Sequence, residues 1–342
     1  MSSHADLRRW WQAQRRSDAA PDQASPETVA RTFHAAVRDG ILEMPLPGSG
    51  QTSQRWAQLS WWGGTDLSVA RLVEGHVDAV AILAELAGPA LPAGTSSAVW
   101  AAEPPGAGVE AKPTGDGWDL SGTKAWCSGA SSCDTALLTA TTPAGSQLFV
   151  VDLGADGIVR QPRSWRNAGM AASDTESVEF AVVPATAVGP PGSYLSRPGF
   201  WIGGIGVAAV WWGGAAAVAR PLRAAAAADR AGPHALAHLG RIRTLLDSCA
   251  ALLESAAQAV DREPRADHEA LAVSVRSAVA DAASEVLDRV GRALGPAPLA
   301  AAGEHAQRVA DLTVYLRQHH AERDLARLGE LDGLTFRKEP TW

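Results

Sequence analysis

The chain has 342 residues, of which 46% are hydrophobic and 20% are charged, so it is long enough to bury a substantial core. This composition excludes a disordered chain, a collagen-like fibre and a small disulfide scaffold. Its 30 basic and 37 acidic side chains give a net charge of -7, and no segment carries the basic run of a nucleic-acid surface, so we expect no nucleic-acid partner.

The cysteines and the N-terminal segment bear on the compartment. Cys127, Cys133 and Cys249 cannot all pair and lack a partner pair at zinc-ligand spacing, so we expect reduced thiols and no metal site. Residues 1–16 are polar, and no apolar run reaches the roughly 18 residues that span a membrane. We therefore expect a cytoplasmic protein with no membrane span.

Residues 1–93 are expected to form an N-terminal helical domain. Its clearest helix follows Asp66, a candidate N-cap, and carries a broad apolar face to Leu86 before Gly88 and Pro89 end it.

Residues 94–194 change to a period of two, with turn residues every eight to twelve positions. Short β-rich runs at residues 136–142, 147–151 and 178–183 lie between these turns. We expect a central β-domain with a barrel or sandwich arrangement.

Residues 195–330 return to a helical pattern and predict a C-terminal four-helix bundle, with residues 331–342 as a peripheral tail. The expected helices are residues 200–228, 234–260, 268–294 and 304–328. Small residues in the first of these helices predict close helix contact, with Trp211 and Trp212 filling space. The predicted fold class is therefore α+β.

The motif that points to a family is Gly-Trp-Asp-Leu-Ser-Gly-Thr-Lys-Ala-Trp-Cys-Ser-Gly at residues 117–129. It resembles a strand-turn-strand element of the acyl-CoA dehydrogenase superfamily of FAD-dependent flavoproteins, which ends in Lys-x-Trp-x-(Thr/Ser). The resemblance implies that Trp126 lies against the flavin ring, that Ser128 bonds near its reactive nitrogen, and that Cys127 lies between them in the cofactor site. The alternative is a β-hairpin whose Trp fills the core.

A second motif, residues 99–108, is similar to the loop of that family that wraps the flavin and the substrate thioester. Ala102 and Gly108 stand where the family has Thr and Ser, so Trp100, Ala101 and Ala102 are assigned to cofactor binding through main-chain groups. Residues 169–180 resemble the closing strand of the β-domain.

Two positions of the C-terminal bundle are assigned to the FAD diphosphate and adenosine by the same resemblance. Arg230 stands where the family has an Arg that reaches the pyrophosphate, although Arg241 or Arg243 could substitute. Gly295 is what remains of a Gly-Gly-x-Gly loop.

The usual catalytic base of the family is absent. His319 falls where the resemblance places the Glu that removes the α-proton, with His320 beside it, and the first bundle helix carries no carboxylate. His319 and His320 are the candidate catalytic residues; their alternative interpretation is a solvated helix end. His76 is an alternative site histidine or a core histidine.

The resemblance implies an FAD-dependent oxidoreductase that performs α,β-dehydrogenation of an acyl thioester, with a small-molecule substrate such as an acyl-CoA and a homodimeric or homotetrameric assembly. Two alternatives stay open: a flavin-dependent monooxygenase of the same fold, favoured by the missing Glu, and a catalytically inactive partner subunit.

Overall fold

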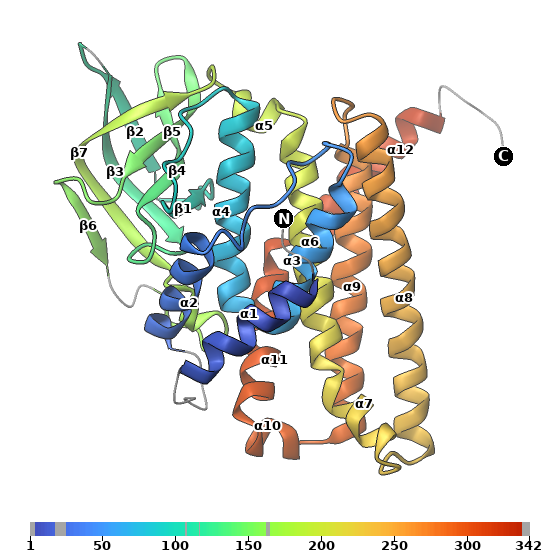
Figure 1. The fold of residues 1–342 in the computed structure, drawn as a ribbon. Helices are drawn as coiled ribbons and strands as arrows, with labels where there is room; N and C mark the ends of the chain where they lie inside the picture. Colours follow the sequence, from blue (N-terminus) through green and yellow to red (C-terminus); the bar gives the residue numbers. More distant parts are fainter. Residues whose placement is uncertain (1–3, 18–24, 107, 116, 162–164, 337–342) are drawn as a thin grey trace. The chain divides into compact units, whose positions relative to one another are not determined.

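The computed structural model describes residues 4–17, 25–106, 108–115, 117–161 and 165–336. Four helices come first (Figure 1): α1 His4–Ser17, α2 Pro26–Arg38, α3 Thr52–Thr65 and α4 Leu67–Glu85. The strands follow, with one short 3-10 helix: β1 Ser97–Trp100, β2 Gly108–Pro113, β3 Trp118–Cys127, β4 Thr135–Thr142, β5 Gly145–Asp152, β6 Ile158–Gln161, η1 Ala171–Ser173 and β7 Glu176–Val188. The remaining elements are helical: α5 Ser193–Ser196, α6 Gly199–Val218, α7 Arg220–Ala227, α8 Pro233–Arg262, α9 Glu269–Leu294, α10 Ala297–Ala301, α11 Gly303–Tyr315, η2 Leu316–Gln318 and α12 Glu322–Phe336.

The contacts divide the chain into two compact units. Unit 1 is formed by the described residues of Met1–Met44 and Ser68–Phe200, and unit 2 by those of Pro45–Leu67 and Trp201–Trp342. The division differs from the three consecutive ranges expected from the sequence, because α3 packs with the C-terminal helices. The α+β class is confirmed.

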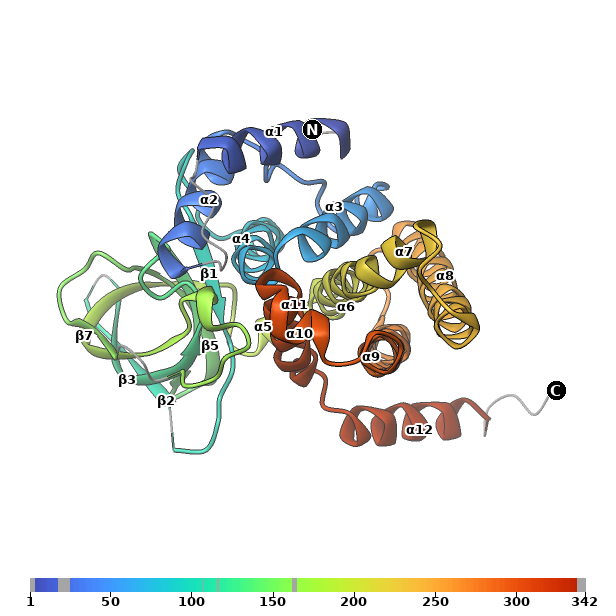
Figure 2. The same ribbon diagram turned by 90° about the horizontal axis from the view of Figure 1, so that it is seen from below.

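The strands of unit 1 form a mixed sheet whose pairings close on themselves. Strand β4 pairs with β2, β2 with β3, β3 with β7, β7 with β5, and β5 again with β4. The pairings of β4 with β1 and β2 are parallel, and the others are antiparallel. Figure 2 shows β2, β3, β5 and β7 curving around this ring, which is the geometry of a small barrel.

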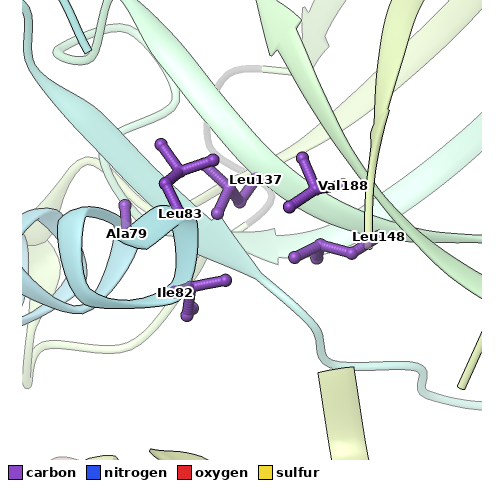
Figure 3. Packing of buried hydrophobic residues seen from close by; sticks show 6 residues of the cluster. All are labelled: Ala79, Ile82, Leu83, Leu137, Leu148 and Val188. Carbon is purple, nitrogen blue, oxygen red and sulfur yellow. The ribbon is translucent and has the colours of Figure 1, made fainter. Parts of the chain in front are cut away.

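One core cluster joins α4 to the barrel. Ala79, Ile82 and Leu83 of α4 contact Leu137, Leu148 and Val188 from β4, β5 and β7, and all six side chains are buried (Figure 3). Burying each of the larger side chains contributes roughly 1.5–3 kcal/mol. The apolar face predicted for the helix after Asp66 is therefore the face that covers the barrel.

Unit 2 is built on close contact between α3 and α6. A Cβ atom at Gly213 would lie 1.9 Å from the Ser60 carbonyl oxygen, and one at Gly63 would lie 2.1 Å from the Val210 carbonyl oxygen. Glycine at both positions is what allows the main chains to approach this closely. The small-residue pattern of α6 thus has the packing role that the sequence predicted, and Trp211 is fully buried.

Helix α6 is apolar on every side, as expected of a central helix. In the described part of the chain, the stretch Gly199–Ala227 is long and apolar enough to cross a membrane by length and composition, and 78% of its most apolar window is buried inside the structure. A buried core helix gives the same signal, so this stretch is weak evidence for a span.

Four boundaries expected from the sequence are corrected. The helix predicted at residues 200–228 is interrupted before Arg220, where Pro221 starts α7. The helix predicted at 304–328 ends at Tyr315, and α12 begins at Glu322. The tail from residue 331 is helical as far as Phe336. The strand-turn-strand expected at residues 117–129 is the single strand β3 followed by a turn.

Candidate functional site

Trp126 is displayed on the outside of the barrel by a break in strand pairing. Lys124 of β3 pairs with Val178 of β7, but Cys127 pairs with Glu176, so two residues of β3 oppose one of β7. This β-bulge coincides with a left-handed backbone at Trp126, whose φ is 58°. Trp126 is consequently 55% exposed, which contradicts the alternative in which it fills the core.

The core position belongs instead to Trp100 at the end of β1. Its side chain is 2% exposed, and its indole Nε1 donates to the Ser128 carbonyl oxygen at 2.9 Å. The structure therefore brings Trp100 and Ser128 together, with Trp100 as a buried support beneath the end of β3.

The turn after β3 is fastened to the segment that precedes β7. Gly129, with φ of 73°, donates from its N–H to the Ser173 carbonyl, and Ala130 donates to the Asp174 carbonyl. The Asp174 carboxylate in turn accepts from the Ser131 N–H and the Ser132 hydroxyl, each at 2.7 Å. These bonds fix the position of Ser128 relative to the barrel.

The Ser128 hydroxyl oxygen accepts two hydrogen bonds from residues distant in the sequence. Thr175 Oγ1 donates at 2.9 Å, and Arg71 Nε, from α4, donates at 3.3 Å. A hydroxyl has two acceptor lone pairs and one donor hydrogen, so both acceptor positions are filled. With both acceptor positions filled, Ser128 has only its hydroxyl hydrogen left to offer to a further partner.

The loop after β1 contains Ala101 and the exposed Ala102, and it is tied down by the buried Lys124. Lys124 Nζ donates to the carbonyl oxygen and to Oγ1 of Thr139, each at 2.8 Å, and lies 3.4 Å from the Glu103 carboxylate. Burial lowers the pKa of Lys124, and the charge of Glu103 opposes that change. The lysine of the motif therefore holds the Glu103 loop against β4.

Cys127 pairs with Glu176 of β7 at the end of β3. Its thiol is fully buried, and burial raises its pKa to about 12. The buried thiol is therefore not part of the surface that displays Trp126.

His76, on α4, is a buried neutral side chain. Its Nδ1 accepts from the Ser97 N–H at 3.3 Å, and burial lowers its pKa to about 4 against the opposing charge of Asp134. The core interpretation of this histidine fits its surroundings in unit 1.

His319 and His320 lie in the connection between η2 and α12 of unit 2, which corrects the expectation that they lie on one continuous helix. Ala321 has a left-handed backbone with φ of 47°, and the Asp324 carboxylate accepts from the His320 N–H at 3.2 Å. The Gln318 carbonyl accepts from Arg276 at 3.2 Å. Side chains thus replace the helical bonds lost at this break, although no Pro or Gly marks it.

His319 points into unit 2, with both ring nitrogens engaged. Nδ1 accepts from the Ala321 N–H at 3.1 Å, and Nε2 lies 3.0 Å from the Ser277 hydroxyl. Its ring also meets Trp211 edge-on. Burial lowers the pKa of His319, while the nearby Asp324 opposes this. The neutral ring therefore carries its proton on Nε2.

The remaining candidate site residues are more exposed to solvent. The His320 side chain is 55% exposed, with Nδ1 3.4 Å from the Asp324 carboxylate. Arg230 is exposed in the turn after α7, and Gly295 ends α9 with φ of 65° and open space where a Cβ would be. A side chain at Gly295 would be strained whatever the space around it.

Arg71 and Thr175, the two partners of the Ser128 hydroxyl, were not found from the sequence. Arg71 lies 57 residues before Ser128 and Thr175 lies 47 after it, so no local pattern connects them. Over the described residues, no group of three or more His, Cys, Asp or Glu side chains is arranged to hold a metal ion.

No family model matches the chain, and no curated protein matches it. Solved structures do. A KijD3 in complex with FMN and a dTDP-linked amino sugar is 20% identical, has a TM-score of 0.78 and aligns over 96% of this chain and 93% of its own. The methanesulfinate monooxygenase MsuC from Pseudomonas fluorescens is 18% identical, with a TM-score of 0.70 over 92% of this chain and 96% of its own.

A steroid ACAD variant, Tcur3481-Tcur3483 G363A, is 20% identical, with a TM-score of 0.68 over 97% of this chain and 93% of its own. These neighbours are acyl-CoA dehydrogenase-like flavoproteins. The chain therefore has the acyl-CoA dehydrogenase-like fold, as the resemblance predicted.

Proposed function

We propose that this protein is a flavin-dependent oxidoreductase that acts on a small molecule. The observation that carries the proposal is the presentation of Trp126 and Ser128. A bulge turns an indole outward at the cost of a left-handed backbone, and two residues later a hydroxyl keeps its hydrogen for a ligand. Strained, exposed aromatic residues of this kind are typical of binding sites.

These side chains fit a flavin. An exposed indole offers a face for stacking on the isoalloxazine ring, and the Ser128 hydrogen is a donor for an acceptor atom at its edge. The Glu103–Lys124 contact fixes the loop that carries Ala101 and Ala102, whose main-chain groups are suited to the polar edge of the ring.

The identity of the flavin is part of the proposal. The sequence predicts FAD, whereas KijD3 and TdsC from Paenibacillus sp. A11-2 are structures with FMN. Arg230 was assigned to the diphosphate of FAD, which FMN lacks. Arg230→Ala is therefore expected to weaken FAD binding severalfold and leave FMN binding unchanged; equal effects on both would remove Arg230 from the site.

The proposed reaction is α,β-dehydrogenation of an acyl thioester or related carbonyl compound. A bound flavin would accept a hydride from the substrate and, once reduced, would react with oxygen. For dehydrogenation the protein also has to remove the α-proton, and His319 is the residue proposed for that step. His319 has to release the Ala321 N–H from Nδ1 before that nitrogen can accept a proton.

Monooxygenation is the second candidate, and the engagement of both nitrogens of His319 favours it. A reaction with oxygen does not require removal of an α-proton from a thioester. MsuC is named as a monooxygenase of this fold, whereas the steroid ACAD is named for dehydrogenation. Dehydrogenation requires His319 to accept a proton, whereas monooxygenation does not, so a variant of His319 distinguishes the two reactions.

Flavin titration is the first test. Purified protein is titrated with FMN and with FAD, and quenching of flavin fluorescence is recorded for the wild type, Trp126→Ala and Val182→Ala. Val182 is a matched control, because it also lies in a bulge with φ of 60° and is 64% exposed. We expect at least a tenfold loss of affinity for Trp126→Ala and none for Val182→Ala. No uptake by the wild type would refute the flavin proposal and leave the partner-subunit hypothesis.

The reaction is tested on the loaded protein. Under anaerobic conditions, bleaching of the flavin band by one member of an acyl-CoA panel supports dehydrogenation, and loss of that bleaching in His319→Ala supports its role. A band that no thioester bleaches, together with oxygen-dependent hydroxylation of indole by the reduced protein, supports monooxygenation. The homo-oligomer implied by the resemblance stays a prediction, which light scattering checks.

A further inference from the structure

Arg71 and Glu74 form an ion pair on α4, and Arg71 also donates a hydrogen bond to the Ser128 hydroxyl. Arg71 Nη1 contacts the Glu74 carboxylate one helical turn away, and Arg71 Nε donates to Ser128 Oγ at 3.3 Å. The two charged side chains are 16% and 11% exposed. A buried ion pair of this kind is costly to desolvate, so it stabilises the fold little by itself.

A small cavity lies at the same place. It has a volume of about 10 Å³ and is lined by Arg71, Gly75, Ser128 and Cys133, with Leu72, Ala98 and Val99. This is about the space of one water molecule. Bulk water therefore does not separate the guanidinium from Ser128, and the charge of Arg71 is only weakly screened there.

These contacts determine the direction in which the Ser128 hydroxyl hydrogen points. Arg71 and Thr175 fill both lone pairs of its oxygen, so the hydroxyl hydrogen is directed elsewhere. A hydrogen bond from a positively charged donor also polarises the hydroxyl, which makes it a stronger donor toward an electron-rich acceptor. Electron density on a flavin rises on reduction, so such a donor stabilises the reduced form more than the oxidised form.

We propose that Arg71 is a positioning residue that raises the reduction potential of the bound flavin through Ser128, and that Glu74 limits the size of this effect. The inference rests on the proposed function, because it requires a flavin at Trp126 and Ser128. It goes further by placing control of the potential on a charged pair of α4, outside the motif that carries the family resemblance.

The experiment measures the ratio of oxidised to reduced flavin against a reference dye during slow anaerobic reduction. Arg71→Gln is expected to shift this ratio at least tenfold toward the oxidised form, which is about 30 mV for a two-electron couple. Glu74→Gln is expected to shift it toward the reduced form. Damage to folding moves both variants in the same direction, so the opposite signs identify an electrostatic effect.

Two further variants test the route and the specificity. In a Ser128→Ala background, Arg71→Gln is expected to lose more than half of its shift, because the hydroxyl that transmits the effect is gone. Arg38→Gln removes the same charge from a side chain of unit 1 that is 70% exposed, and it is expected to change the ratio by less than twofold.

The outcomes separate the two proposals. Flavin uptake by the wild type with a ratio in Arg71→Gln within twofold of the wild type overturns the inference and leaves the flavin proposal intact. No flavin uptake by the wild type overturns both. If Arg71→Gln does not fold, Glu74→Gln decides: an unchanged ratio of oxidised to reduced flavin in that variant, or a shift toward the oxidised form, overturns the inference.

Discussion

Replacing Gly213 by alanine places a methyl group against the main chain of α3. The added Cβ would lie 1.9 Å from the Ser60 carbonyl oxygen and 2.9 Å from the Gly64 nitrogen. Main-chain atoms cannot rotate away as a side chain can, so α3 and α6 have to separate by about 1 Å at this point. Overpacking of this kind costs about 3 kcal/mol, which lowers the melting temperature by roughly 6–12 °C.

Thermal unfolding followed by circular dichroism measures this change, and Gly240→Ala is the matched control. Gly240 lies inside α8 with nothing within 4 Å of an added Cβ. Alanine there is expected to stabilise the helix by about 0.5–1 kcal/mol, because glycine is a poor helix former. A Gly213→Ala protein that melts at or above the wild-type temperature would refute the close approach of α3 and α6.

Three further predictions concern unit 1 and the thiols. Trp126→Gly is expected to change the free energy of unfolding by less than about 1 kcal/mol, because the lost indole is half exposed and glycine relieves the left-handed backbone; a large loss in urea unfolding would mean that Trp126 is a core residue. Since the pKa of His76 falls from 6.5 to about 4, the unfolded chain binds a proton between these pH values that the folded protein does not, and stability is expected to fall by about 3 kcal/mol as pH drops through this window. His76→Asn should flatten this dependence of stability on pH; a slope in His76→Asn equal to that of the wild type would contradict the prediction. Burial raises the pKa of all three cysteine thiols, so iodoacetamide at pH 8 is expected to label them only after unfolding, and rapid labelling of the folded protein would count against their burial.

Long periodic segments could be predicted from the sequence. The helix expected after Asp66 spans Leu67–Glu85, and the one expected at 268–294 spans Glu269–Leu294. Both have a clear apolar face, and Gly-Pro pairs follow their ends. The break between Tyr315 and Glu322 was missed, because Asp324 and Arg276 stabilise it and no Gly or Pro announces it.

The residues of the candidate site could likewise be predicted only in part from the sequence. Trp126 and Ser128 were found because they belong to one contiguous motif, although the bulge that exposes Trp126 was not foreseen. A bulge depends on which residue of β7 stands opposite, and that information lies about 50 residues away. The partners of Ser128 were missed for the same reason: Arg71 reaches it from another element.

The closed circuit of strand pairings also constrains the order in which unit 1 can be completed. Strand β7 pairs with β3, β5 and β6, so the barrel stays open until residues 176–188 have been synthesised. Before that point three strands expose unpaired main-chain groups, which are templates for association with other chains. Barrel closure is therefore a late, long-range step of folding, and we expect a chain that ends before Glu176 to be more prone to aggregation than the whole chain.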